Sequence, residues 1–187
     1  MTKVLVVAAT DRELAGAAGV PSVRCGVGPV DAAAATAAGI AAYRPSAILH
    51  IGIAGARRGC GIAPLSIVVG SESLYCDLQL PGDWAPRTLT PNGELVDAAR
   101  RALPEAAARP IGTSARVGGT SGCDVEAMEG FAVLRAAQLA GVPAVEVRAI
   151  ANEIEEPDRA AWRLDEAFDT IAKATPRLVA EIAACVS

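Results

Sequence analysis

Short apolar runs alternate with longer segments rich in Ala and Leu along the whole chain. The short runs are continuously apolar or rich in β-branched residues, as expected for strands buried on both faces of a sheet. They predict six strands, at residues 4–9, 23–27, 47–52, 66–70, 111–117 and 144–150. The longer segments predict four helices, at residues 31–43, 92–103, 125–140 and 164–186. We expect the last helix to break near Pro176, because proline lacks the N–H group that a helix interior needs.

This alternation is typical of an α/β fold. Repeated strand–helix units place helices on both faces of a mostly parallel mixed sheet, which gives three layers, α/β/α. The chain has 187 residues, of which 52% are apolar, and this is enough to bury one core. Since no linker, repeat or low-complexity tract divides the sequence, we expect a single domain over residues 1–187.

Charge and cysteine content narrow the range of partners. The net charge is −4, and the clustered Lys and Arg of a nucleic-acid or anionic-membrane surface are absent, which favours a small neutral or cationic ligand. The apolar run at the N-terminus is too short for a signal peptide or a membrane span. The five cysteines form no CxxC pair, so we expect reduced thiols in the cytoplasm and no zinc site or disulfide framework.

Two glycine-containing stretches lie at or just after the ends of predicted strands. Gly26-Val27-Gly28 resembles a phosphate loop, but position 31 is Asp where the dinucleotide fingerprint has Gly, so we expect no nucleotide cofactor. In the second stretch, Ile53, Ala54 and Gly55 would let backbone amides approach a ligand at the carboxyl end of a strand.

Histidine and arginine offer few candidates for chemistry. His50 is the only histidine, so a Ser-His-Asp or Cys-His arrangement would have to use it, and a structural role at the end of a strand is the alternative. Arg57 and Arg58 are typical of a solvated loop pair.

Two glutamates stand at the head of the predicted helix 125–140. Glu129 begins an apolar row at helical spacing, made of Ala132, Val133, Ala136 and Ala140. Its carboxylate should therefore emerge on the inward face, where it could accept two hydrogen bonds from the vicinal diol of a ribose. Glu126 lies one turn earlier. An interaction with the helix dipole, with Asp124 as the N-cap, would explain Glu126 equally well.

The residues around these glutamates resemble the purine nucleoside phosphorylase and nucleosidase superfamily. The resemblance rests on Met128-Glu129-Gly130 and on the strand that closes in Val147-Arg148-Ala149-Ile150-Ala151-Asn152, and it covers most of the chain. Residues 6–13 are similar to the opening strand and loop of the methylthioadenosine/adenosylhomocysteine nucleosidases. Within the superfamily, residues 126–130, 148–152 and 157–167 most resemble the futalosine hydrolases of menaquinone biosynthesis.

The resemblance implies a purine nucleosidase with no metal or organic cofactor, acting as a homodimer on futalosine. Glu13 would be the general base that activates water, while Glu129 would bind the ribose hydroxyls and Met128 would line the sugar. Asn152, where adenine-specific nucleosidases carry an aspartate, would donate to O6 of hypoxanthine. Trp162 would wall the pocket over the base or the 5′ substituent.

Each of these residues also has a structural explanation. Glu13 could be an exposed glutamate at the start of a helix, Met128 and Trp162 could be packing residues, and Asn152 could be a turn residue.

The sequence departs from the family pattern in two places. Only residues 118–124 connect the predicted strand 111–117 to the next helix, where the family has a longer base-binding loop and a further helix. Ile53 stands where the methylthioadenosine nucleosidases carry a serine.

Three other functions remain open at this point. One is a methylthioadenosine/adenosylhomocysteine nucleosidase. Another is a nucleoside phosphorylase that holds phosphate with Arg24, Arg57 or Arg58. The third is a nucleoside-binding protein without turnover.

Overall fold

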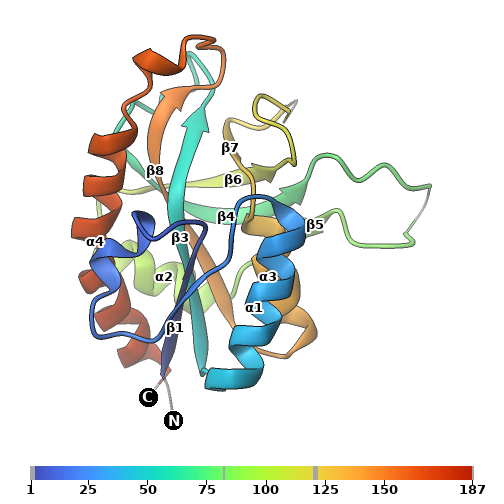
Figure 1. The fold of residues 1–187 in the computed structure, drawn as a ribbon, viewed down its shortest axis with the longest axis vertical. Helices are drawn as coiled ribbons and strands as arrows, with labels where there is room; N and C mark the ends of the chain where they lie inside the picture. The colour runs from blue at the N-terminus through green and yellow to red at the C-terminus, as the bar shows by residue number, and fades with distance from the viewer. Residues whose placement is uncertain (1–2, 82, 120–121, 187) are drawn as a thin grey trace.

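A mixed sheet of eight strands forms the middle layer of the protein (Figure 1). The computed structural model describes residues 3–81, 83–119 and 122–186. The strands follow one another in space in the order β2-β1-β3-β7-β6-β4-β5, and β8 pairs with both β3 and β4. Their bounds are Val4–Ala8 (β1), Ser22–Arg24 (β2), Ala47–Ala56 (β3), Ile67–Tyr75 (β4), Thr88–Leu89 (β5), Ala107–Thr113 (β6), Val125–Ala127 (β7) and Ala144–Glu153 (β8).

Most of the strand pairs are parallel, as expected. β1 pairs in parallel with β2 and β3, β3 with β8, β4 with β6, and β6 with β7. The pairs β3–β7, β4–β8 and β4–β5 are antiparallel. Because β3, β8, β4, β6 and β7 pair in succession and β7 returns to β3, this part of the sheet closes on itself as a small barrel.

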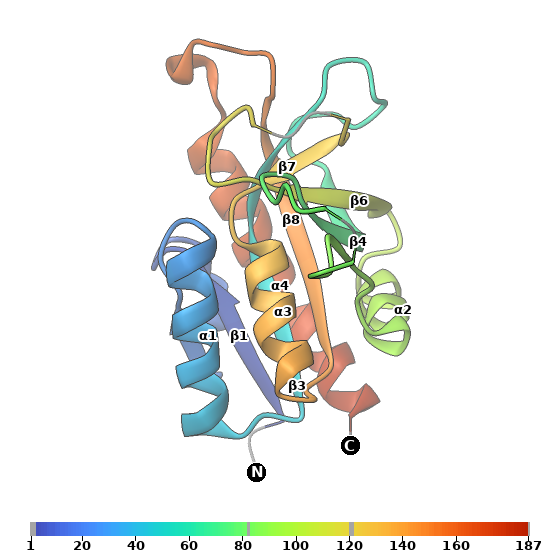
Figure 2. The same ribbon diagram turned by 90° about the vertical axis from the view of Figure 1, so that its right-hand side faces the viewer.

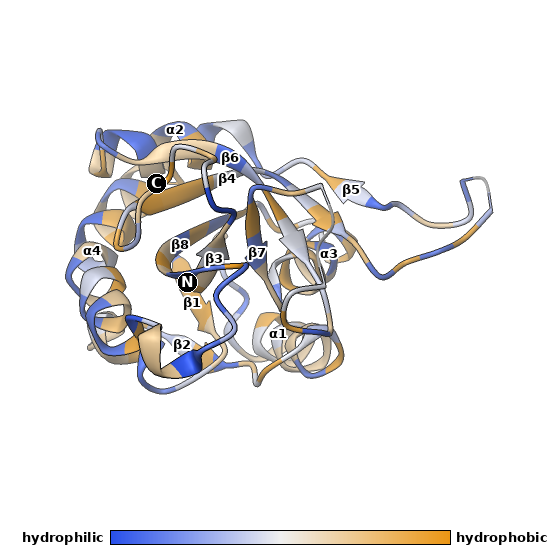
Figure 3. Cartoon of the chain, turned by 90° about the horizontal axis from the view of Figure 1, so that it is seen from above, coloured by the Kyte–Doolittle hydropathy of each residue, from blue (hydrophilic) through white to orange (hydrophobic). Residues whose placement is uncertain are grey.

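Helices cover both faces of the sheet. The helices α1 (Pro29–Tyr43) and α3 (Gly130–Leu139) lie side by side on one face (Figure 2). The other face carries α2 (Gly93–Ala102), α4 (Leu164–Cys185) and the short 3-10 helix η1 (Glu13–Ala17), and a second short helix, η2, spans Arg159–Ala161. Seen from above, the strands lie between these two helix layers (Figure 3).

The apolar strands are buried on both sides, which explains their continuous apolar runs. Along β1, Val4 and Val6 pack into the core beneath α2 and α4, whereas Leu5 and Val7 pack into the core beneath α1 and α3. Alternate side chains of one strand thus pack into two separate cores, so neither face of the strand needs polar residues.

The expected helix over residues 125–140 is wrong in its first part. Residues Val125–Ala127 form β7, and the helix begins at Gly130 with Glu129 at the N-cap position. Glu126 pairs with Gly55 of β3 and Gly112 of β6, so this short strand closes the barrel. Pairing on both sides overrides the helical pattern, and Asp124 is not a helix N-cap.

The expected break at Pro176 is also wrong, because α4 continues through it as far as Cys185. Pro176 leaves the carbonyl of Ala172 without its helical partner. That carbonyl lies against Gly16 of η1, where the Cβ of any other residue would clash with it. Glycine at position 16 therefore allows η1 to pack directly against this turn of α4.

Other differences concern strand ends. β6 ends at Thr113, so the connection to β7 spans residues 114–124 and is longer than the expected 118–124; residues 120 and 121 of it lie outside the described residues. Within the described part of the chain, no helix has the length and apolar character required to cross a membrane.

Candidate active site

A cavity of about 200 Å³ lies at the carboxyl ends of β1, β3 and β8. The β1–η1 connection, the β7–α3 junction and the start of α4 with the segment before it form further parts of its wall. It is lined by the nine residues expected at the nucleoside site, namely Glu13, Ile53, Ala54, Gly55, Glu126, Met128, Glu129, Asn152 and Trp162. Carboxyl ends of parallel strands meet at one edge of a sheet, and this brings segments distant in sequence to one place.

Glu13 is buried, with only 3% of its surface exposed, so it is not an exposed glutamate at a helix start. Its Oε2 accepts hydrogen bonds from the backbone N–H and the hydroxyl of Thr10, both at 2.9 Å, and its Oε1 accepts the backbone N–H of Ile53 at 3.1 Å. Burial raises the pKa of Glu13, and the positive charge of Arg148 opposes this shift. The carboxylate is thus held in one orientation and has acceptor capacity left on Oε1.

Glu129 is held from two sides at the head of α3. Its Oε1 accepts the backbone N–H of Gly28 at 3.1 Å, and its Oε2 lies 3.5 Å from Nη2 of Arg148. Because Gly28 directly precedes α1, this contact joins the two helices that cover one face of the sheet. Only 5% of Glu129 is exposed, and the carboxylate faces the cavity lining.

Arg148 of β8 is a functional candidate that the sequence reading did not identify. It is fully buried behind the cavity, and its Nη2 contacts Nε2 of His50 at 2.5 Å. Its Nε donates to Oε1 of Glu146 at 2.8 Å. The sequence does contain an indication of this charged pair. Glu146 and Arg148 are two residues apart in an apolar strand, and this spacing places their opposite charges on the same face of the sheet.

His50 has a structural role. Its Nδ1 donates to the carbonyl of Val7 at 3.0 Å, so Nε2 is the acceptor for Arg148. Complete burial, together with the charge of Arg148, holds the pKa of His50 well below its ordinary value, and the ring is neutral. A neutral histidine that accepts from a cation does not serve as the base of a Ser-His-Asp arrangement.

Gly52 allows two charged side chains to approach the same point of β3. A Cβ at this position would clash with Nη1 of Arg148 and lie 2.7 Å from Oε1 of Glu13. The guanidinium and the carboxylate therefore meet over the Cα of Gly52, and glycine is required because of this close approach.

Glu126 projects from β7 and not from the first turn of a helix. Its Oε1 accepts the backbone N–H of Gly118 at 2.5 Å, which fixes part of the 114–124 connection beside the cavity. Val117 of this connection contributes to the cavity wall. The helix-dipole explanation of Glu126 is therefore wrong.

Asn152 and Trp162 lie at another side of the cavity. Nδ2 of Asn152 donates to the carbonyl of Glu153 at 2.8 Å, which leaves its second amide hydrogen and its carbonyl oxygen for a ligand. Nε1 of Trp162 donates to the carbonyl of Glu156 at 3.1 Å, which fixes the indole ring. Met128 adds apolar surface to the lining.

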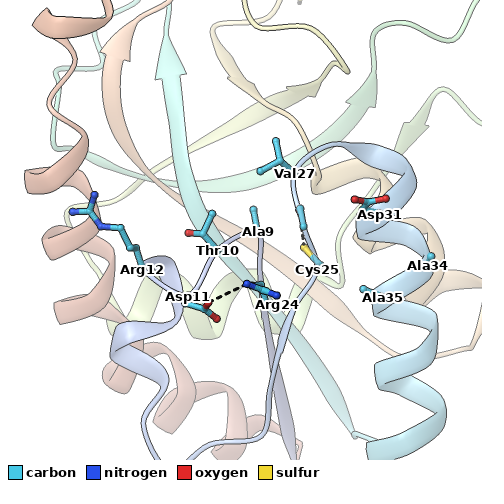
Figure 4. A pocket seen from close by; sticks show the side chains of 11 residues that line it. Ala9, Thr10, Asp11, Arg12, Arg24, Cys25, Val27, Asp31, Ala34 and Ala35 are labelled. Carbon is cyan, nitrogen blue, oxygen red and sulfur yellow. Dashed lines mark hydrogen bonds and ion pairs between the residues drawn. The ribbon is translucent and has the colours of Figure 1, made fainter.

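Basic side chains lie around the cavity, outside the part of its wall that the described residues form. Arg24 pairs with Asp11 at 3.2 Å in an adjoining hollow of about 640 Å³, which shares Ala9, Thr10 and Val27 with the cavity (Figure 4). The other two candidate phosphate ligands pair with carboxylates elsewhere: Arg57 with Glu155 at 3.1 Å, and Arg58 with Glu153 at 2.6 Å. Of the described residues that line the cavity, none is Lys or Arg.

All five cysteines are free thiols, with Sγ of Cys76 and Sγ of Cys123 3.9 Å apart. Over residues 3–81, 83–119 and 122–186, no group of three or more His, Cys, Asp or Glu side chains is arranged to hold a metal ion.

Sequence comparisons connect this chain to known enzymes. A family model described as the phosphorylase superfamily matches residues 13–187. The chain is 34% identical to a futalosine hydrolase from Streptomyces coelicolor over 177 residues, which cover 82% of this chain and 75% of the relative. It is 32% identical to a futalosine hydrolase from Thermus thermophilus over 182 residues, which cover 83% and 79% of the two chains.

Solved structures share the fold. The futalosine hydrolase of Helicobacter pylori superposes with a TM-score of 0.87 at 16% identity, covering 96% of this chain and 98% of that chain. The S-adenosylhomocysteine nucleosidase of Streptococcus pyogenes, in complex with 5-methylthiotubericidin, gives a TM-score of 0.85 at 19% identity, with 95% and 96% covered. The three-layer architecture expected from the sequence is confirmed. The chain belongs to the phosphorylase superfamily and, within it, to the family of the futalosine hydrolases.

Proposed function

We propose that this protein is a purine nucleosidase that hydrolyses the N-glycosidic bond of futalosine, releases hypoxanthine, and so acts in menaquinone biosynthesis. The observation that carries the proposal is the pair of buried carboxylates, Glu13 and Glu129, which face one cavity whose described lining has no Lys or Arg. The two curated relatives named futalosine hydrolase support the choice of substrate.

Glu13 is the proposed general base. Water that attacks C1′ must lose a proton, and a carboxylate with free acceptor capacity on Oε1 can take it. The hydrogen bonds from Thr10 and Ile53 hold Glu13 in place before substrate arrives. Burial raises its pKa, which makes the carboxylate a stronger base than an exposed glutamate.

Glu129 is the proposed ribose ligand. Cleavage passes through a sugar with oxocarbenium character, and a nearby carboxylate both binds the diol and stabilises the developing positive charge. The hydrogen bond from Gly28 fixes Oε1 while Oε2 faces Arg148, so the orientation of the carboxylate is set before the ribose binds.

Asn152 is the proposed contact to the base. Its remaining amide hydrogen can donate to O6 of a 6-oxopurine while its carbonyl oxygen faces N7. The proton that Glu13 takes from water returns through solvent to the leaving base, and the Asn152 carbonyl oxygen can accept a hydrogen bond from N7 once N7 carries that proton. Trp162 would cover the base or the 5′ substituent. The adjoining hollow beside Thr10 and Val27 offers room for a large 5′ group.

Hydrolysis is favoured over phosphorolysis by the charge of the cavity. Glu13, Glu126 and Glu129 line it, and a phosphate dianion next to these carboxylates would be repelled. The three arginines considered as phosphate ligands are ion-paired outside the described lining.

The test is incubation with futalosine, inosine and methylthioadenosine, each with and without phosphate, followed by chromatography of the released base. Release of hypoxanthine from futalosine at a rate that phosphate does not change is the expected result. Faster release of adenine from methylthioadenosine would instead support the adenosine-type nucleosidase, and a requirement for phosphate would support the phosphorylase. Tight binding without product would identify a binding protein.

A homodimer through the α1–α3 face is part of the proposal. An apolar hollow of about 670 Å³ runs over both helices, and Val30 and Leu139 in it are 78% and 71% exposed. Apolar surface of this kind is typical of a protein interface. Sedimentation should give a dimer for the wild type and a monomer for Leu139→Glu, and a monomeric wild type would contradict the assignment.

We also propose a cytoplasmic location, supported by the five free thiols and testable by cell fractionation.

A further inference from the structure

Glu146 is a fully buried carboxylate of β8 that lies outside the cavity lining. Its Oε1 accepts the hydrogen bond from Nε of Arg148 at 2.8 Å, and its Oε2 lies 3.5 Å from the hydroxyl oxygen of Ser73. The first residue of α3, Gly130, leaves room for it, since a Cβ there would clash with both carboxylate oxygens. A charge buried this deeply is costly unless it is paired. The glycine provides the space for this carboxylate, and the arginine provides the opposite charge.

Arg148 divides its donors between two sides. Behind the cavity, it makes its short contacts, to Glu146 through Nε and to His50 through Nη2 at 2.5 Å. Toward the cavity, Nη2 lies 3.5 Å from Oε2 of Glu129 and Nη1 lies 3.5 Å from the carbonyl of Ile53. The contacts of the guanidinium behind the cavity are therefore shorter than its contacts on the side of the cavity.

The charges in this cluster are unevenly balanced. Burial lowers the pKa of Arg148, but the glutamates 146, 129 and 13 outweigh this and raise it, so the guanidinium remains charged. Burial raises the pKa of Glu146, and Arg148 opposes the shift. Because His50 is neutral, Arg148 is the cation that balances the negative charges of these three carboxylates.

The geometry points to Glu146 as a positioning residue that holds Arg148 back from Glu129 and so keeps the Glu129 carboxylate available to the ribose diol. This inference rests on the proposed ribose role of Glu129. An arginine that lost its rear carboxylate would close on the nearest remaining one, and two-point pairing is the preferred geometry of guanidinium with carboxylate. Such a pair would occupy acceptor sites of Glu129 that the two hydroxyls need.

The test is the preference for ribose, measured as the specificity constant for inosine divided by that for 2′-deoxyinosine. Glu146→Gln, which keeps an acceptor for Nε but removes the charge, should lower this ratio by about 10-fold relative to the wild type. Glu146→Asp keeps the charge but withdraws it by one carbon, and a smaller fall of about threefold is expected. Thr175→Ala is the matched control: it alters a buried hydrogen bond in α4, so it should lower the melting temperature and leave the ratio unchanged.

A double-mutant cycle separates this role from a merely stabilising one. In a Glu129→Gln background, Glu146→Gln should change the ratio no further, because Glu146 is inferred to act through Glu129. An unchanged ratio in Glu146→Gln, or an equal fall in both backgrounds, would overturn the inference. If Glu146→Gln does not fold, the Asp variant decides by the same ratio. A wild type with no ribose preference would instead contradict the proposed role of Glu129 itself.

Discussion

The carboxylate of Glu13 accepts the backbone N–H of Ile53 at 3.1 Å, which ties the first residue of η1 to β3. Thr10 adds two hydrogen bonds to the other carboxylate oxygen. This fixed and buried carboxylate has a raised pKa, because the loss of hydration outweighs the attraction of Arg148. Its protonation state should therefore be visible in the kinetics.

The specificity constant should fall on the acid side of neutrality with an apparent pKa above the ordinary value of 4.5 for a glutamate. A general base works only when ionised, so activity is present above the raised pKa and is lost as the pH falls through it. The measurement is the pH profile of the specificity constant for the wild type. An acid limb at or below 4.5, or no acid limb, would contradict this assignment.

Glu129→Ala should weaken the binding of ribosides by about 1.5–3 kcal/mol, because the diol loses a charged acceptor. A 2′-deoxyriboside offers one hydroxyl fewer and should lose less. Binding of both ligands to the wild type and to the variant can be measured by calorimetry. Equal losses for the two ligands would remove Glu129 from ribose recognition.

Gly52→Ala should lower turnover by about 10²-fold, since its Cβ would displace both Arg148 and Glu13 from their positions. Gly93→Ala is the matched control, because a Cβ there would meet no described atom within 4 Å beyond its own turn of helix. We expect the control to retain activity and to gain up to about 1 kcal/mol of stability, because alanine has less conformational freedom than glycine in the unfolded chain. Turnover and thermal melting of the two variants distinguish displacement of the site residues from a general loss of stability. Wild-type turnover in Gly52→Ala would show that Arg148 and Glu13 do not depend on their close approach to Gly52.

Asn152→Asp should erode a preference for hypoxanthine over adenine. If the Asn152 amide donates to O6, a 6-amino purine presents a donor to it, and the mispairing should cost about 5- to 150-fold in specificity constant. A protonated aspartate can donate to N7 of adenine, while an ionised one repels O6. The ratio for inosine over adenosine should therefore fall in the variant. A wild-type preference for adenosine, or a ratio that the substitution does not change, would leave Asn152 as a turn residue.

Patterns of apolar residues predicted the layers because the strands that carry them are buried on both faces, as Val4 and Leu5 illustrate. The same patterns failed at residues 125–127. The sequence there has the spacing of a helix, but Glu126 pairs with Gly55 and Gly112, which are distant in sequence. Such pairing is decided by tertiary structure and leaves no local signal.

The lining of the site could be predicted because its residues lie in recognisable motifs at strand ends. The buried support of the site could not be predicted in the same way. Arg148 stands inside the motif that carries the family resemblance, and Glu146 lies inside an apolar strand, so neither stands out as a site residue in the sequence. Their spacing of two residues indicates a shared face, but what they contact across the sheet, His50 included, depends on which strands are neighbours.

The most direct test of the central claim is hypoxanthine release from futalosine in phosphate-free buffer by the wild type and by Glu13→Gln. The wild type should release hypoxanthine without phosphate, and Glu13→Gln should turn over about 10²-fold more slowly, the usual contribution of a general base, with KM nearly unchanged. No release until phosphate is added, or equal turnover in the two proteins, would contradict hydrolysis with Glu13 as the base.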